Sequence, residues 1–278
     1  MIKGTLDWNL DPVIFWITAS FPLKYYGLFF ACGLLLGFYI VKRIYLKEKV
    51  SLDSLDTLLV YVVLGTVLGA RLGHCFFYEP AYFLKNPIEI LLPIKKIGEA
   101  YQFVGFQGLA SHGGTIGVLI AIVVYCKKYK VNMLWLLDRV AIAVPVTGAC
   151  IRLGNFMNSE IYGKPTDGGW GVVFQRDDLV PRHPTQLYEA FSYLGIFAIL
   201  LFLYHYKKAK NADGVIFGYF LTLLFLARFC IEFFKENQER FESQMFINMG
   251  QILSIPFIIL GLIFILRQTK SEELKLQS

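Results

Sequence analysis

The amino-acid sequence predicts an all-α, polytopic membrane protein with about seven transmembrane helices and a small outer head segment. Composition is the first observation: 56% of the 278 residues are hydrophobic and only 17% are charged, whereas a typical soluble domain has about 25% charged residues. The second is that several apolar stretches reach the roughly 20 residues with which a helix crosses a bilayer. The third is that cationic residues gather in short segments between these stretches, as in loops at a membrane surface.

Seven apolar stretches are expected to span the membrane, in the order 24–44, 55–78, 108–127, 133–154, 185–206, 214–235 and 247–267. Thirteen of the 27 Lys and Arg residues fall in four short segments, which are 42–49, 127–130, 207–210 and the tail from Arg267. The positive-inside rule predicts that these segments are cytoplasmic. The N-terminus then lies outside, and the C-terminus lies in the cytoplasm.

We expect residues 1–278 to form one integral membrane domain. No internal repeat is evident, which gives no support to the inverted-repeat architecture of many transporters. The outer segments 79–107 and 155–184 are the longest. The second is rich in Gly and Pro and is expected to form the small extracytoplasmic head segment. The apolar stretch 11–20 is too short to span and is expected to lie at the membrane interface.

Several classes of partner and of chemistry are disfavoured. The net charge of +6 would suggest nucleic acid in a soluble protein, but basic loops account for it here, so no nucleic acid is expected. The five cysteines lie in or beside apolar stretches without a CxxC pair, as small buried side chains do. The sequence has no metal-ligand cluster, P-loop, nucleophile elbow or GxGxxG motif. We therefore expect neither a metal nor a cofactor.

Glycines recur every four residues in the first two spans, at Gly33 and Gly37 and then at Gly65, Gly69 and Gly73. Such ridges could line a substrate groove, but small residues at this spacing commonly allow two helices to pack closely. We interpret both ridges as helix-packing surfaces.

Polar and ionisable groups in the spans fall mainly toward one side of the membrane. A charged side chain deep in a bilayer costs roughly 3 kcal/mol or more and persists only when it is paired, hydrated or used. With the predicted topology, one set lies toward the outer face: Tyr26, Arg71, His112, Arg152, Arg228 and Glu232. Asp138 and Arg139 fall at the inner end, where a structural pair or a headgroup contact accounts for them.

This outer polar layer suggests an anionic ligand. Three arginines face few acids, namely Glu232 and Glu160. The abundant anion at this depth is a lipid phosphate, which the planar fork of Arg binds well. His112 adds a group that exchanges a proton near neutral pH. Taken singly, each residue has a structural alternative: Arg228 and Glu232 could pair within one helix turn, and His112 could fill a helix crossing. Together they favour transfer of part of a phospholipid.

Five segments follow one another along the chain: SHGGTIG (111–117), RLGNFMNSEIYG (152–163), RHPTQLYE (182–189), RFCIEFFK (228–235) and MGQILSIP (249–256). In this order they resemble the bacterial prolipoprotein diacylglyceryl transferases. The resemblance implies an enzyme of the bacterial plasma membrane with its site near the outer face. It implies transfer of the sn-1,2-diacylglyceryl group of phosphatidylglycerol to the lipobox cysteine of a prolipoprotein. The products would be a thioether and glycerol phosphate, in the first step of lipoprotein maturation.

The same resemblance implies roles for single residues. It gives catalytic roles to His112, Arg152 and Arg228, with His112 as the base. It implies that phosphatidylglycerol is bound by a set of six residues: Arg152, Tyr26, Asn155, Glu160, Gly163 and Glu232. Leu224 departs from the family, which often has tyrosine one turn before the arginine of the sixth span, so a role for that hydroxyl does not carry over.

Two other functions predict different sequences. A transporter or lipid flippase would use the arginines as a path for anions, with polar residues at several depths and repeat symmetry. A phosphatidyltransferase would need an acidic metal cluster within its spans. The sequence has one polar layer, no evident repeat and no such cluster, which favours the diacylglyceryl transferase.

Overall fold

The computed structural model describes residues 4–18, 21–92, 94–98, 100–103, 108, 110–206, 213–236 and 245–277. The basic segment 207–210 lies outside them. The chain divides into two compact units: unit 1 is Met1–Ile44 with Leu134–Ser278, and unit 2 is Tyr45–Met133. The expectation of a single domain stays a prediction.

Six helices among the described residues are long and apolar enough to cross a membrane, so the chain is a multi-pass membrane protein of mostly helical fold, as predicted. They are Tyr25–Glu48, Leu52–Phe77, Met133–Met157, Thr185–His205, Val215–Phe234 and Met249–Arg267. The remaining expected span, 108–127, corresponds to α5 (Ser111–Tyr129), which is not one of these six. The count of seven spans stays a prediction.

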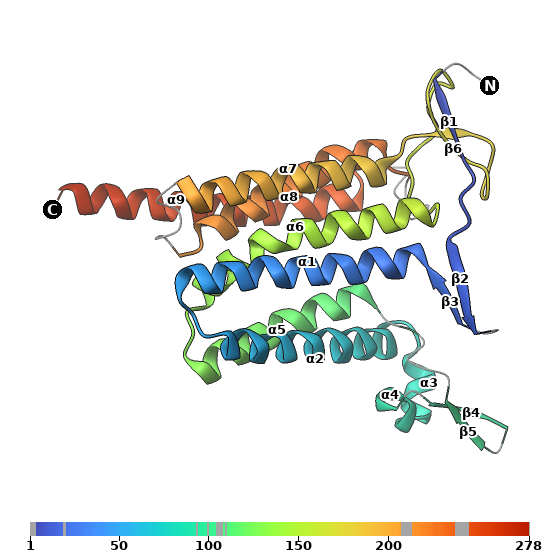
Figure 1. Ribbon diagram of the computed structural model, residues 1–278, viewed down its shortest axis with the longest axis horizontal. Helices are drawn as coiled ribbons and strands as arrows, with labels where there is room; N and C mark the ends of the chain where they lie inside the picture. The colour runs from blue at the N-terminus through green and yellow to red at the C-terminus, as the bar shows by residue number, and fades with distance from the viewer. Residues whose placement is uncertain are drawn as a thin grey trace. The chain divides into compact units, whose positions relative to one another are not determined.

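Long helices make up most of unit 1: α1 (Tyr25–Glu48), α6 (Met133–Met157), α7 (Thr185–Tyr206), α8 (Val215–Ile231), the 3-10 turn η2 (Glu232–Phe234) and α9 (Met249–Gln277). Figure 1 shows α6, α7 and α8 running side by side. Their shared core contains Ile142, Leu200 and Ile216, which are fully buried. Many large apolar side chains on the other helix faces are exposed, because lipid rather than water covers such faces in a bilayer.

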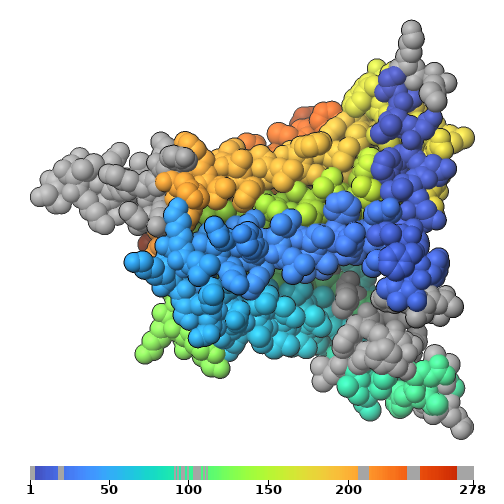
Figure 2. Space-filling view, in the orientation of Figure 1, coloured from blue at the N-terminus to red at the C-terminus, as the bar shows by residue number. Residues whose placement is uncertain are grey.

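A small sheet forms the head of unit 1, in the order β1 (Thr5–Trp8), β6 (Gly171–Phe174) and β7 (Pro181–Arg182). Strands β1 and β6 are parallel, and β6 and β7 are antiparallel. The rings of Trp8 and Phe156 lie 4.5 Å apart between centroids, and Phe174 packs in the same cluster. In Figure 2 the dark-blue N-terminal strands lie beside the yellow head residues.

Within the stretch 11–20, predicted to lie at the interface, residues 13–18 form a strand. It forms β2 (Val13–Thr18), which pairs with β3 (Phe21–Lys24) in an antiparallel arrangement. Phe15, Trp16 and Ile17 on β2 are exposed. The all-α expectation gave no sign of these short strands.

Unit 2 contains α2 (Leu52–Phe77), α3 (Pro80–Lys85), α4 (Ile88–Leu91), β4 (Ile94–Ile97), β5 (Ala100–Phe103) and α5. Helices α2 and α5 run side by side (Figure 1). A Cβ on Gly69 would lie 2.7 Å from the Cα of Gly117 on α5. In unit 1, a Cβ on Gly37 would lie 2.7 Å from Oγ1 of Thr147 on α6. Both glycine ridges are therefore helix-packing surfaces, as predicted.

Asp138 and Arg139 form a structural pair, as predicted. Asp138 is fully buried on α6, and its two carboxylate oxygens accept hydrogen bonds from the N–H groups of Gly214 and Phe217, both at 2.7 Å. These N–H groups belong to the start of α8, where a helix has donors without an intrahelical partner. Arg139 Nη1 lies 3.7 Å from Asp138 Oδ2. One helix thus caps its neighbour.

Candidate active site

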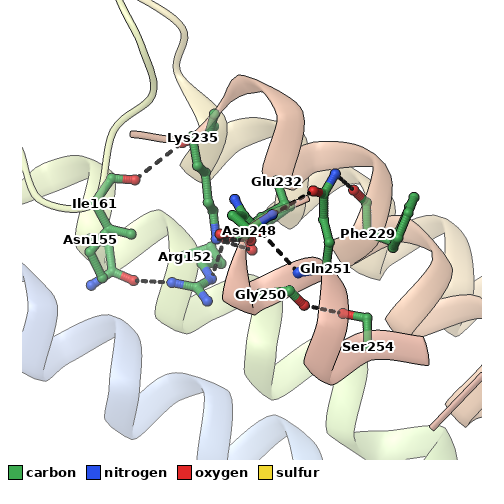
Figure 3. A network of polar contacts seen from close by, with 12 residues as sticks. Arg152, Asn155, Ile161, Phe229, Glu232, Lys235, Asn248, Gly250, Gln251 and Ser254 are labelled. Carbon is green, nitrogen blue, oxygen red and sulfur yellow. Dashed lines mark hydrogen bonds and ion pairs between the residues drawn. The ribbon is translucent and has the colours of Figure 1, made fainter. Parts of the chain in front are cut away.

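Arg152 lies on α6 between two other polar side chains. Its Nε lies 2.6 Å from Oε2 of Glu189 on α7, and its Nη1 donates a hydrogen bond to Oδ1 of Asn155 at 3.3 Å (Figure 3). Arg152 and Asn155 are three residues apart and share a helix face, as predicted. The contact with Glu189 is an ion pair whose angle is not that of a hydrogen bond, since Oε2 accepts none from the described residues.

Glu189 also binds a second cation. Its Oε1 accepts a hydrogen bond from Nζ of Lys235 at 2.8 Å, and the same Nζ lies 3.8 Å from Oε2 of Glu232. Glu189, Lys235 and Glu232 are all at most 5% exposed, and buried charges persist when they are paired.

Asn155, in the last turn of α6, is joined to Glu160 in the turn that follows the helix. Nδ2 of Asn155 donates to Oε2 of Glu160 at 3.5 Å, and Nδ2 of Asn158 donates to Oε1 of the same carboxylate at 3.0 Å. The buried amide of Gln186 donates to the main-chain carbonyl of Glu160 at 2.6 Å. Glu160 is exposed, and its carboxylate fixes the amide that bonds Arg152.

The same turn contains a strained residue. Ile161 has a φ of 58°, a left-handed conformation that is a genuine outlier for a β-branched residue and costs on the order of 1–3 kcal/mol. Oγ1 of Thr185, at the start of α7, donates to the Ile161 carbonyl at 3.1 Å. Such strain persists where surrounding contacts over-determine the backbone, and it is common at functional sites.

Tyr26 and Gly163 occupy two other places in unit 1. Tyr26 packs on α6, because a Cβ on Gly154 would lie 3.1 Å from Cδ2 of its ring. Gly163 lies in the head, where its N–H donates to the carbonyl of His183 at 2.8 Å. A Cβ on Gly163 would lie 2.7 Å from Cγ2 of Thr185, so this position requires glycine for close packing.

Arg228 lies in the last turn of α8 and is half-buried. The pairing that its i, i+4 spacing with Glu232 suggests is not formed, because Glu232 begins the 3-10 turn and pairs with Lys235 instead. Within the part of the chain that the structure describes, no hydrogen bond or ion pair engages the Arg228 guanidinium.

Arg71 and His112 belong to unit 2, so the prediction that they lie level with Arg152 stays a prediction. Arg71 is buried and donates hydrogen bonds to the main-chain carbonyls of three residues: Glu89, Ile90 and Gly108. Its guanidinium lies 4.8 Å from the ring centroid of Phe83. His112 is exposed in the first turn of α5, so it does not fill a helix crossing.

The expected set of acids, Glu232 and Glu160, is incomplete. Sequence reasoning missed Glu189, which pairs with Arg152, and it missed Lys235, which pairs with Glu189. Both residues stand in segments that carry the family resemblance. The signal that could have found Glu189 is an acid near the start of an apolar span, which requires a buried cation as its partner.

The site can bind an anion and stabilise growing negative charge. The Arg152 guanidinium has five N–H donors, so it can hold Glu189 and Asn155 and still offer donors to a phosphate. No group of three or more His, Cys, Asp or Glu side chains arranged to hold a metal occurs among the residues described.

Fold and candidate site together define an integral membrane protein with a polar cluster centred on the half-buried Arg152. The family model described as prolipoprotein diacylglyceryl transferase matches residues 12–267. The chain is similar to phosphatidylglycerol–prolipoprotein diacylglyceryl transferases of two bacteria. It is 49% identical to that of Tolumonas auensis over 268 residues, covering 96% of this chain and 99% of the relative. It is 44% identical to that of Bacteroides fragilis over 272 residues, covering 98% of each. The chain belongs to the prolipoprotein diacylglyceryl transferase family and is a transferase, which confirms the resemblance.

Proposed function

We propose that this chain transfers the sn-1,2-diacylglyceryl group of phosphatidylglycerol to the lipobox cysteine thiol of prolipoproteins, the first step of lipoprotein maturation. The family and the names of the relatives support the two substrates. One observation supports a particular site for this reaction: Glu189 and Asn155 hold the guanidinium of Arg152 in a fixed position. An oriented Arg fork is well suited to binding two phosphate oxygens together.

In the proposed reaction the thiolate sulfur attacks the glycerol carbon that bears the phosphate. A C–S thioether bond forms, the C–O bond breaks, and its electron pair leaves on the oxygen of glycerol phosphate. A thiol with a pKa of about 8.5 is a poor nucleophile until it is deprotonated, and His112 is the proposed acceptor of its proton. Arg152 and Arg228 would stabilise the negative charge on the departing phosphate. The assignment of His112 rests on its chemistry and on the family resemblance.

The remaining site residues are proposed to hold the headgroup. Tyr26 packs against Gly154 on α6, and Asn155 and Glu160 are hydrogen-bonded to one another. We assign these three residues to orienting the lipid. Gly163 and Glu232 are proposed to act by holding the site in shape, since one permits close backbone packing and the other pairs with Lys235.

The proposed location is the bacterial plasma membrane, with the N-terminus outside, the C-terminus in the cytoplasm and the site near the outer face. The basic segments of the sequence support this orientation. The lipid bilayer supplies phosphatidylglycerol, and no nucleic acid is proposed as a partner.

The test is the mass of a synthetic lipobox peptide after incubation with the purified protein and phosphatidylglycerol. The proposal expects a gain of one diacylglyceryl group on the cysteine, and no gain on a peptide with serine in its place. An unmodified cysteine peptide, from protein that still binds phosphatidylglycerol, would contradict the proposal and favour lipid transport.

A further inference from the structure

Lys235 carries a buried ammonium group that the proposed reaction does not use. It follows η2 directly and is 5% exposed, although lysine is rarely buried unless it is paired. Its Nζ lies 2.8 Å from Oε1 of Glu189 and 3.8 Å from Oε2 of Glu232. Figure 3 shows the Lys235 side chain extending toward Arg152 and Glu232. One ammonium group therefore stands between two buried carboxylates.

The closer carboxylate also holds Arg152. Glu189 presents Oε1 to Lys235 and Oε2 to Nε of Arg152, so its carboxylate plane is fixed from both sides. If the ammonium group were removed, a buried carboxylate would lose one of its two cations, which leaves charge uncompensated. Glu189 would then interact with Arg152 alone, and its carboxylate would no longer hold the Arg152 guanidinium in one orientation.

The backbone of the head holds Lys235 in place. Gly163 and Lys235 form an isolated antiparallel bridge, and the N–H of Lys164 donates to the carbonyl of Phe234 at 2.8 Å. Gly163 has no side chain, and this allows the two backbone segments to lie so close together. The segment that carries the ammonium group is thus paired with the head as well as continuous with α8.

Helix α9 holds Glu232 from the other side. A Cβ on Gly250, in the first turn of α9, would lie 2.5 Å from Cδ of Glu232. A reciprocal cap fixes this helix start, since Asn248 N–H donates to Gln251 Oε1 at 3.0 Å and Gln251 N–H donates to Asn248 Oδ1 at 2.9 Å. The position of Glu232 therefore depends on the absence of a side chain at Gly250.

We propose that Lys235 is a positioning residue for Arg152. It holds Glu189 in the orientation that directs the Arg152 guanidinium to the phosphate of phosphatidylglycerol. This inference rests on the proposed function and adds a residue to it. Lys235 acts through Glu189 and not on the lipid, because protein carboxylates surround its Nζ. A misplaced Arg152 should slow the step in which phosphate charge grows more than it weakens lipid binding.

The test measures kcat, and the KM for labelled phosphatidylglycerol, with a lipobox peptide as the acceptor. Lys235→Met keeps an unbranched apolar chain without the charge and should lower kcat about 10- to 100-fold, with KM close to the wild-type value. Lys235→Arg should recover most of this loss, because Arg can pair with both carboxylates. Lys164→Met is the matched control: Lys164 is exposed and its Nζ donates to the carbonyl of Phe233 at 3.1 Å, so kcat should stay unchanged.

A double-mutant cycle tests the route through Glu189. In Glu189→Gln the carboxylate that Lys235 orients is gone, so adding Lys235→Met should cost little further kcat. Full additivity of the two losses would overturn the inference. A wild-type kcat in Lys235→Met would overturn it as well, as would a Lys235→Arg variant as slow as Lys235→Met.

If Lys235→Met fails to fold, kcat of Gly250→Ala is measured instead. This substitution should displace Glu232 without changing any charge and so lower kcat. Gly195→Ala on α7 is its control, because a Cβ there meets nothing within 4 Å. Equal, wild-type kcat values for both glycine variants would overturn the inference. A wild-type protein that transfers no diacylglyceryl group would refute the proposed function itself. Transfer by wild type and equally by Lys235→Met would refute the positioning role alone.

Discussion

Arg152 and Arg71 look alike in the sequence and differ in the folded protein. Each lies near the predicted outer end of an apolar span. In unit 2, Arg71 donates hydrogen bonds to main-chain carbonyls, those of Glu89, Ile90 and Gly108. In unit 1, Arg152 pairs with the side chain of Glu189, which also binds Lys235.

The partners that the structure describes for the two arginines differ in kind. Glu89 and Ile90 belong to α4, whose last carbonyls have no intrahelical donors, so Arg71 satisfies the backbone and holds the fold. A carboxylate shared by two cations leaves Arg152 with donors for another anion. Charge and a position near the end of an apolar span, which both arginines share, do not by themselves distinguish a structural residue from a functional one.

The largest effect is expected at Arg152. Arg152→Ala removes the fork that holds the phosphate and should lower turnover by roughly 10²–10³-fold or more, as the loss of a transition-state donor does. Transfer of labelled diacylglyceryl to a lipobox peptide measures the change. Turnover within a few fold of wild type would contradict the assignment of Arg152 to the site. Arg152 would then be a structural residue like Arg71.

His112 tests whether unit 2 contributes chemistry as well as structure. His112→Gln keeps a polar side chain but cannot take a proton, and loss of a general base costs typically 10²–10⁴-fold. We expect a loss of about 10² in turnover, measured with the same labelled lipid and peptide. Near-normal turnover would contradict the base role and leave thiol deprotonation to the field of the arginines.

Asp138 extends the comparison to a buried charged residue whose expected role is only structural. Asp138→Ala removes the acceptor of two N–H groups at the start of α8 and should lower the free energy of unfolding by about 1–2 kcal/mol, as the loss of a helix cap does. Thermal unfolding in detergent measures this cost. Turnover per folded molecule should stay unchanged, and a selective loss of turnover would give Asp138 a functional role.

The smallest expected effect is the pH dependence of the stability of the head. A hydrogen bond from Arg182 at 2.8 Å holds the pKa of Asp178 below its ordinary value, and burial lowers the pKa of His183. For both groups, the pKa in the folded protein lies below the pKa in the unfolded chain. Their contribution to the free energy of unfolding is therefore complete above the unfolded pKa values, and it is lost as the pH falls through the folded pKa values. We expect the melting temperature to fall on acidification. Asp178→Asn should flatten the part below pH ~4, and an unchanged acid profile would contradict this.

Much of the fold follows from the sequence, because spans and helix packing depend on local composition and spacing. The helices and the glycine ridges at Gly37 and Gly69 are of this kind. The strand pairing of β1 with β6 joins residues far apart in the chain, and four-residue strands leave no clear period. The site was predicted in part: Arg152 and Asn155 share a face, but Glu189 and Lys235 meet only through tertiary packing, which no local pattern records.

The most direct test of the difference between the two arginines compares Arg152→Lys with Arg71→Lys. Turnover per folded molecule and melting temperature are measured for each purified variant. Arg152→Lys should keep most of its stability and lose roughly 10²-fold in turnover, because Lys lacks the planar fork. Arg71→Lys should melt at a lower temperature and turn over at the wild-type rate per folded molecule. Wild-type turnover in Arg152→Lys, with a selective loss of turnover in Arg71→Lys, would contradict the assignment of one arginine to the site and the other to the fold.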